Sequence, residues 1–237
     1  MRPTPLHIGI VGCSAEGAAL CFRTLCAEGP ALLGPHAHPP VSLHAPSLSD
    51  YVQALERDDL ASVAALMLES ADRLQSAGAD FLICPDNTIH QAFDLVEAHS
   101  PLPWLHIAQV VAVEARRRGL RRLGVLGTTW LMASTVYPRA LQALGIGCML
   151  PAASQRGEIG RIIMDELVPA RPRAQSTAFL QRVISDLQAS GCDGVVLGCT
   201  ELPLVLDDTN SPLPTLDSTR LLARAALRRA VGLEASR

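Results

Sequence analysis

The chain lacks lysine altogether. All 20 basic residues in its 237-residue sequence are arginines. A pyridoxal phosphate enzyme holds its cofactor through a lysine Schiff base, and a P-loop places a lysine on its phosphate ligand. The sequence therefore excludes both kinds of site.

Disulfide frameworks and metal sites have little support either. The seven cysteines form an odd, scattered set without a CxxC pair, which argues against a disulfide framework and against a structural zinc site. His36 and His38 lie in a stretch rich in glycine and proline, with no carboxylate or thiol beside them. We expect no metal site.

The charge balance gives no sign of a polyanionic partner. The formal net charge is −3 and the isoelectric point is near 6.1, so neither nucleic acid nor a membrane is an expected partner. No apolar run reaches the roughly 20 residues that cross a bilayer as a helix. We predict a cytoplasmic protein that acts on a small molecule.

Apolar runs alternate with amphipathic stretches, which is typical of α/β proteins with parallel sheets. The pattern predicts two similar doubly wound domains, residues 1–112 and 113–237, related by pseudo-twofold symmetry, with the active site in the cleft between them. The helix predicted near 218–231 can return to pack on the first domain. Residues 28–50 are predicted as a long loop. Strands are predicted at 7–12, 41–43, 81–84, 123–128, 148–150 and 195–197, and helices at 14–26, 58–77, 89–98, 131–144, 158–167, 176–190 and 218–231.

One strand-and-turn segment occurs twice, once in each half of the chain. Residues 79–88 and 192–201 each place an apolar run before a polar cluster, 113 residues apart. In this register Asp86 corresponds to Cys199. The opening strand of each half also repeats, at a separation of 115 residues. The agreement of the two separations favours a duplicated architecture over a chance similarity of apolar strands.

Asp86 and Cys199 are proton-transferring groups at equivalent places. A reaction at both faces of one carbon needs one such group on each face. The reference pKa is about 8.5 for cysteine and about 3.9 for aspartate, so burial or a neighbouring charge has to make Asp86 more basic. Structural roles remain open for both residues: Asp86 as the N-cap of the following helix, and Cys199 as a buried thiol against the sheet.

Short polar side chains follow four of the predicted strands. At a helix N-terminus such side chains either cap the helix or bind a small anion. Each hydroxyl taken alone is more typical of a cap, but four clusters beside two ionisable groups indicate a pocket for a carboxylate. The candidate binding residues are Ser14, Asn87, Thr88, Thr128, Thr129, Thr200 and Glu201.

The sequence Gly-Cys-Thr-Glu at 198–201, together with Pro85–His90, resembles the aspartate/glutamate racemase superfamily, in the form found in aspartate racemases. The resemblance extends over nearly the whole chain. It implies two similar α/β domains with the active site between them, no cofactor, and Cys199 as the second catalytic thiol, and it is compatible with a homodimer. The residues that it assigns to the substrate's α-carboxylate and amino group are Asn87, Thr88, Thr128 and Thr200, assisted by Ser14.

The sequence departs from the family pattern at one catalytic position. The family's first catalytic cysteine precedes Asn-Thr, and here that position is Asp86. Cys84, two residues earlier, is not expected to replace it. Because there is no lysine, a distal substrate carboxylate would need an arginine, for which Arg57, Arg161 and Arg171 are candidates.

These observations favour a cofactor-independent racemase or epimerase that acts on an acidic amino acid such as aspartate or glutamate. Proton transfer at Cα would use two bases, Asp86 and Cys199. Two alternatives remain. One is a related decarboxylase or cis–trans isomerase of a small dicarboxylic acid with Cys199 as its sole thiol, and the other is a non-catalytic homologue that binds a small molecule.

Overall fold

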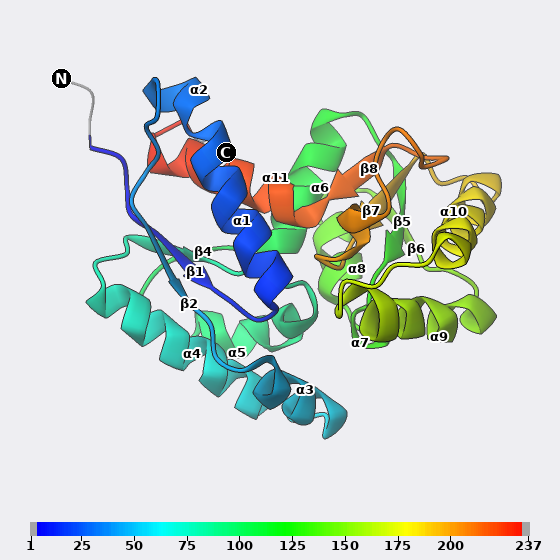
Figure 1. Cartoon of the computed structure of the whole chain (residues 1–237), viewed down its shortest axis with the longest axis horizontal. Coiled ribbons are helices and arrows are strands. Elements are labelled where there is room, and N and C mark those ends of the chain that lie inside the picture. The colour runs from blue at the N-terminus through cyan, green and yellow to red at the C-terminus, as the bar shows by residue number, and fades with distance from the viewer. Residues whose placement is uncertain (1–3, 234–237) are drawn as a thin grey trace. The chain divides into compact units, whose positions relative to one another are not determined.

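The computed structural model describes residues 4–233, which fall into two compact units (Figure 1). The first unit contains the chain up to Ile107 together with the segment from Thr219 onward, and the second contains Ala108–Ser218. The division thus lies at Ile107, whereas the sequence pattern places it at 112. Within the described residues, no helix is both long and apolar enough to cross a membrane.

The first unit is built on a sheet of four parallel strands in the order β2-β1-β3-β4. Figure 1 shows α1 and α4 on opposite sides of this sheet, and the central strands β1 and β3 are accordingly apolar and buried throughout. The strands are β1 (Ile8–Val11), β2 (Val41–His44), β3 (Phe81–Ile83) and β4 (Trp104–Leu105). The helices are α1 (Ala15–Glu28), α2 (Pro30–Leu33), α3 (Leu48–Glu56), α4 (Leu60–Ser76), the 3₁₀ helix η1 (Thr88–Ala92), α5 (Phe93–Glu97) and α11 (Ser218–Ala230).

The last helix, α11, is held in the first unit by three kinds of contact. Arg224 forms an ion pair with Glu28 of α1 at 2.8 Å. The guanidinium of Arg229 lies 4.8 Å from the centroid of the Phe81 ring on β3, a cation–π arrangement. The Leu6 N–H donates to the Ala230 carbonyl at 2.9 Å. The chain therefore returns to the unit in which it began.

The second unit has the same plan, with parallel strands in the order β6-β5-β7-β8. Apolar side chains of α9 and α10 pack on β5 and β7 to form its main core. The strands are β5 (Arg122–Leu126), β6 (Gly147–Met149), β7 (Gly194–Leu197) and β8 (Thr215–Asp217). The helices are α6 (Ile107–Arg117), α7 (Thr129–Ala133), α8 (Val136–Gln142), α9 (Ala153–Ile162), the π-helical turn η2 (Ile163–Leu167), α10 (Ala174–Ala189) and the 3₁₀ helix η3 (Leu202–Leu204).

The two units share their strand register as well as their strand order. Ile10 lies opposite Ile83 in the first sheet, and Val125 lies opposite Val196 in the second. Val125 follows Ile10 by 115 residues and Val196 follows Ile83 by 113, the separations already visible in the sequence. The predicted duplication of an α/β unit with a parallel sheet is therefore confirmed.

Asp80 and Asp193, which precede β3 and β7, have matching structural roles. The Asp80 carboxylate accepts the His7 N–H at 2.6 Å, and the Asp193 carboxylate accepts the N–H groups of Arg121 and Arg122 at 2.8 and 2.9 Å. Each carboxylate fixes the start of the neighbouring central strand, at the edge opposite the polar clusters. This role in the scaffold separates them from Asp86 and Cys199 at the other ends of β3 and β7.

Three predicted segments differ from the structure. The helix predicted at 131–144 is divided into α7 and α8, because Ser134 has an extended backbone and its hydroxyl donates to the Leu131 carbonyl at 2.7 Å. The predicted loop at 28–50 contains its predicted strand as β2, but it also contains the helix α2 and runs into α3. The helix predicted at 89–98 begins as the 3₁₀ helix η1 before it becomes α5.

Candidate active site

The carboxyl ends of β1 and β3 are adjacent, because these strands are neighbours in one parallel sheet. Ser14 follows β1, and its hydroxyl accepts the Gly17 N–H at 3.1 Å, which caps α1. The candidate residues Asp86, Asn87 and Thr88 follow β3. The first unit thus gathers four of the predicted site residues at one edge of its sheet.

Asp86 is the residue of this loop that reaches solvent. It is half-buried, whereas Asn87 and Thr88 are only 2% and 6% exposed. Its Oδ1 accepts the Ile89 N–H at 3.1 Å. The N-cap of η1 is Asn87, so Asp86 caps the first turn from the position before it. A bond of this kind favours the ionised form of a carboxyl group.

Cys84 does not offer a second ionisable group in this loop. It is fully buried, and its Sγ points at the Asp86 carbonyl from 3.9 Å. Burial, followed by the nearby Asp86, raises the pKa of the Cys84 thiol well above its usual range. The thiol stays protonated at neutral pH, so it cannot act as the base of this unit.

His90 ends the Pro85–His90 segment and has a structural role that its sequence position did not predict. Its Nδ1 lies 2.6 Å from the Asp86 carbonyl, and its Nε2 lies 3.5 Å from the Ile107 N–H. A carbonyl can only accept, so Nδ1 carries the proton and Nε2 accepts, which defines the neutral Nδ1–H tautomer. The spacing was a possible signal for this role. A histidine four residues after Asp86 can bond to the Asp86 carbonyl when the segment between them forms a helical turn.

Burial keeps His90 neutral. The side chain is 3% exposed, and burial, with a smaller contribution from His106, lowers the pKa of His90 well below its usual value of 6.5. The ring stacks on Phe93 with centroids 5.5 Å apart and meets His106 edge-on at 4.6 Å. A proton on this imidazole would break the Ile107 bond and place a charge among aromatic rings.

The depressed pKa of His90 predicts that stability falls in mild acid. Above pH 6.5 the imidazole is neutral in both the folded and the unfolded chain, so it has no effect. Below pH 6.5 the unfolded chain binds a proton that the folded chain refuses, and stability falls by up to about 1.4 kcal/mol per pH unit until the folded pKa is reached. The free energy of unfolding, measured with urea at pH 5.0, 6.0 and 7.0, should depend less steeply on pH for His90→Asn than for the wild type. Equal slopes would contradict the assignment.

Thr128 and Thr129 begin α7, at the carboxyl end of β5 in the second unit. The Thr128 hydroxyl accepts the Leu131 N–H at 3.1 Å and caps α7. Thr129 is exposed, and its methyl group packs closely on Gly160. A Cβ added at Gly160 would lie 2.6 Å from this methyl group. Thr128 is thus the equivalent of Ser14: a hydroxyl at the end of a central strand that also starts a helix.

Cys199 follows β7 and lies in a hydrogen-bonded cluster with its two neighbours. Its Sγ lies 2.9 Å from Oε2 of Glu201, and the Thr200 hydroxyl donates to the same oxygen at 2.7 Å. Glu201 is only 2% exposed. Since a carboxylate oxygen accepts, the thiol carries the proton in this arrangement. Glu201, predicted as a substrate ligand, therefore also contacts the sulfur directly.

Gly198 allows this turn to form. A Cβ at this position would lie 2.7 Å from the Leu126 carbonyl oxygen and 2.8 Å from the Leu131 side chain. Its N–H donates to the Leu126 carbonyl at 2.8 Å. Only glycine fits so close to the neighbouring central strand. This close approach sets the position of the backbone at Cys199.

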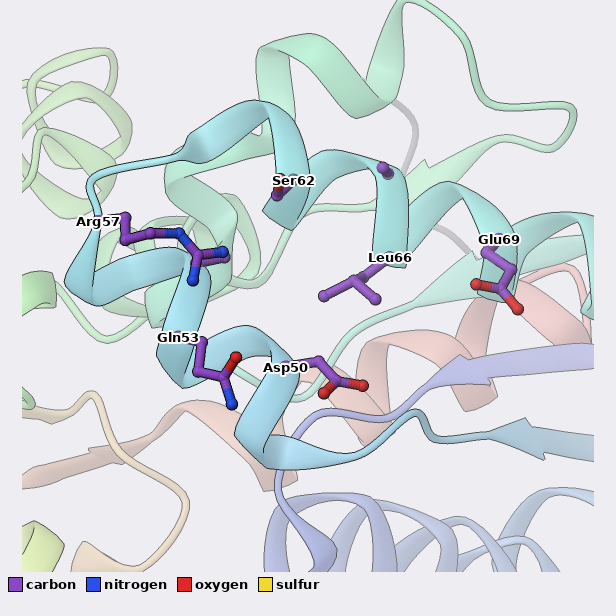
Figure 2. A pocket seen from close by; sticks show the side chains of 8 residues that line it. Asp50, Gln53, Arg57, Ser62, Leu66 and Glu69 are labelled. Carbon is purple, nitrogen blue, oxygen red and sulfur yellow. The ribbon is translucent and has the colours of Figure 1, made fainter.

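Two of the three candidate arginines for a distal carboxylate, Arg161 and Arg57, are close to acidic side chains. Arg161 is engaged with Glu158 at 2.7 Å and with Glu166 at 3.0 Å. Arg57 lines an open hollow of about 330 Å³ between α3 and α4 (Figure 2). Asp50 and Glu69 line the same hollow, so two carboxylates would compete there with an anionic ligand. The described residues contain no group of histidine, cysteine and acidic side chains that could hold a metal ion.

These features agree with comparisons to known proteins. The sequence profile of the Asp/Glu/Hydantoin racemase family matches residues 10–226. The chain belongs to this family. The family match extends from the first central strand to the last helix, so it includes every residue proposed for the site.

Two curated relatives show the range of the family. The broad specificity amino-acid racemase RacX of Bacillus subtilis is 25% identical over 164 residues, which are 68% of this chain and 69% of that protein. A glutamate racemase from Pseudomonas paraeruginosa is 31% identical over 138 residues, which are 56% of this chain and 50% of that enzyme. The match therefore spans about half the length of the glutamate racemase.

Solved structures of family members share the fold. A Yersinia pestis structure provisionally assigned as an Asp/Glu racemase is 30% identical, with a TM-score of 0.87 over 95% of this chain and 99% of that one. An aspartate racemase homologue from Pyrococcus horikoshii is 25% identical, with a TM-score of 0.81 over 97% and 99% of the two chains. The two-unit α/β architecture of this racemase family member is thus that of its relatives.

Proposed function

We propose that the chain is an amino-acid racemase or epimerase, independent of pyridoxal phosphate, that moves a proton at Cα with Asp86 and Cys199. The observation that carries the proposal is the equivalence of these two groups. Each follows the same central strand in its own unit, and the strand registers of the two units match. The absence of lysine and membership of the racemase family support it.

The hydrogen bonds suggest which group begins as the base. Asp86 accepts the Ile89 N–H, as an ionised carboxylate does, while the Cys199 thiol keeps its proton and donates a hydrogen bond to Glu201. In this state Asp86 removes the Cα proton from one face, and the electron pair of the C–H bond remains on the substrate as an enolate-like carbanion. The Cys199 thiol then gives its proton to the opposite face and becomes a thiolate. The other enantiomer reacts with the two roles exchanged.

Glu201 has a part in this cycle beyond substrate binding. After a turnover that starts from Asp86, the thiolate has to regain a proton while Asp86 loses one. The Glu201 carboxylate lies 2.9 Å from the sulfur and is itself bonded to the Thr200 hydroxyl. We assign to Glu201 the orientation of the thiol, while the thiolate regains its proton from water and Asp86 releases one to water.

The polar residues at the strand ends form the proposed binding set for the amino acid's α-carboxylate and amino group. Ser14 and Thr128 cap helices through their oxygens, and a hydroxyl that accepts from an amide still has its own proton to donate. Capping and anion binding are therefore compatible at these positions. The remaining members of the set are Asn87, Thr88, Thr129 and Thr200.

We propose an acidic amino acid, such as aspartate or glutamate, as the substrate. The glutamate racemase and the aspartate racemase homologue named above support this class. RacX is described as having broad specificity, so a wider range has to be tested as well.

The test is a hydrogen-exchange screen in D₂O over both enantiomers of the protein amino acids, followed by NMR. The wild type should incorporate deuterium at Cα and convert either enantiomer into the other, with aspartate or glutamate among the fastest. Absence of exchange across the whole panel would contradict the proposal. Stabilisation of the fold by an amino acid without exchange would instead favour a binding protein.

A single-thiol lyase or isomerase is the second candidate, and the capping bond of Asp86 favours it. If Asp86 serves only to cap η1, Cys199 remains as an acid for protonating a carbanion. Incubation with malonate-type and cis-unsaturated diacids would then release CO₂ or produce the trans isomer. Such turnover without amino-acid exchange would replace the first proposal.

A further inference from the structure

Asp86 lies in a loop after β3, outside the strand pairing of the sheet. β3 ends at Ile83 and η1 begins at Thr88, so Asp86 lies between two regular elements. Two bonds from η1 reach back to it: the Ile89 N–H to its Oδ1 at 3.1 Å, and the His90 Nδ1–H to its carbonyl at 2.6 Å. The carboxylate and the backbone of Asp86 are thus each held by one neighbour.

The His90 ring is well placed to be a rigid support. It is 3% exposed and lies between Phe93, stacked within 15° of parallel, and His106, which meets it at 64°. Phe93 also contacts Trp104 and His106 edge-on, at 5.9 and 4.7 Å. Rotation of the ring would have to displace this aromatic cluster, so the direction of the Nδ1–H bond is set by packing.

The far side of the ring contacts a second backbone element. Nε2 accepts the N–H of Ile107, the first residue of α6 and the last of the first unit. One imidazole therefore joins the Asp86 loop to the point where the chain leaves the first unit. Both bonds exist together only in the neutral Nδ1–H tautomer.

We propose that His90 is the positioning residue of the Asp86 face: it holds the Asp86 backbone so that the carboxylate meets the Cα proton at the reacting distance. This rests on the proposed racemase function. A neutral donor suits the task, because it fixes the loop without adding a positive charge that would make the carboxylate a weaker base. Misplacement of a catalytic group by about 1 Å can reduce a rate by about 10²-fold.

Three variants test the proposal with D- and L-aspartate and D- and L-glutamate in D₂O. His90→Phe keeps an aromatic ring but removes the donor, and His90→Asn keeps a donor that can reach the same carbonyl. His99→Phe is the matched control, because exposed His99 also places its Nδ1 3.0 Å from a carbonyl four residues earlier, that of Leu95. The control should exchange at the wild-type rate.

The expected result is selective for one face. His90→Phe should lower kcat about 10-fold or more for exchange that depends on Asp86, with KM changed less than about twofold. Exchange of the enantiomer that presents its Cα proton to Cys199 should persist, and His90→Asn should recover most of the lost rate. Equal losses for both enantiomers, or no recovery by asparagine, would overturn the proposal, because a general structural defect spares neither face.

A second measurement is independent of turnover. ¹⁵N NMR of histidine-labelled wild-type protein should show His90 as the neutral Nδ1–H tautomer from pH 7 down to pH 5.5. A protonated ring or the Nε2–H tautomer at pH 7 would overturn the proposal even if the enzyme is active. If no amino acid exchanges, the proposed function fails while this spectrum still decides whether His90 holds the Asp86 carbonyl.

Discussion

Replacing Cys199 by serine is expected to abolish racemisation, with a loss of about 10²–10⁴-fold in kcat. A serine hydroxyl keeps the size and a weak donor, but it neither ionises near neutral pH nor gives up a proton as easily as a thiol. One half-reaction should survive. The enantiomer whose Cα proton faces Asp86 should still exchange with D₂O and keep its configuration. The measurement is NMR for deuterium at Cα together with chiral chromatography for configuration.

Cys192→Ser is the matched control for this variant. Cys192 is also a buried thiol of the second unit, 5% exposed, and burial raises the pKa of its thiol. It precedes β7, whereas Cys199 follows it, so racemisation should be kept. Equal activity losses in the two variants would mean that Cys199→Ser acts through folding, and racemisation by Cys199→Ser at the wild-type rate would remove the thiol from the mechanism.

Replacing Asp86 by asparagine is expected to give the mirror-image result. Asparagine can still accept the Ile89 N–H through its side-chain oxygen, so the capping bond is kept while the proton-transferring group is lost. Racemisation should fall by about 10²–10⁴-fold. Retentive exchange should survive for the other enantiomer, the one that reacts with the Cys199 thiolate. Measurement at pH 8.5 raises the thiolate fraction and makes the surviving exchange easier to detect.

Asp72→Asn, at an exposed position of α4, is the control for the Asp86 variant. It should racemise at the wild-type rate. The decisive comparison is between Asp86→Asn and Cys199→Ser: each should spare a different enantiomer. Racemisation within about tenfold of the wild type in Asp86→Asn would show that Asp86 only caps the helix, and would favour a mechanism with one thiol.

The unequal chemistry of the two groups has a kinetic consequence. Their reference pKa values differ by about 4–5 units, so the carboxylate–thiol state is favoured over the carboxylic acid–thiolate state. The equilibrium constant between enantiomers is unity, which requires equal kcat/KM in both directions. The asymmetry of Asp86 and Cys199 can therefore appear only as kcat and KM values that differ between the two enantiomers. The ratio of the two kcat values then equals the ratio of the two KM values.

Much of the architecture could be predicted because it is encoded in local patterns. Apolar strands ending in small polar residues, repeated at separations of 113 and 115, marked both sheets and their matching registers. Other elements were missed, among them the amphipathic helices α3 and α6. β4 and β8 have only two and three residues, too short for a periodic signal, and α2 is a four-residue turn that begins at Pro30. The break between α7 and α8 depends on one serine hydroxyl.

The candidate site was predicted residue by residue but not as a set of interactions. Asp86 and Cys199 could be identified because each follows a strand in the repeated segment. The bond of Cys199 to Glu201 could not, because two residues in a turn meet only when the backbone folds back on itself. The neutral state of His90 depends on its burial beside Phe93 and His106, which lie outside the Pro85–His90 segment and contact the ring only in the folded chain.

By itself, the sequence determined that this protein has two α/β units with parallel sheets, that it cannot use a lysine-bound cofactor, and which two side chains stand at equivalent strand ends. These follow from composition and from patterns repeated along the chain. The tertiary structure alone decided which atoms accept protons and which donate them. Hydrogen-bond direction and burial depend on neighbours that folding brings together, so the pairing of the Cys199 thiol with Glu201 and the tautomer of His90 appear only in the folded protein.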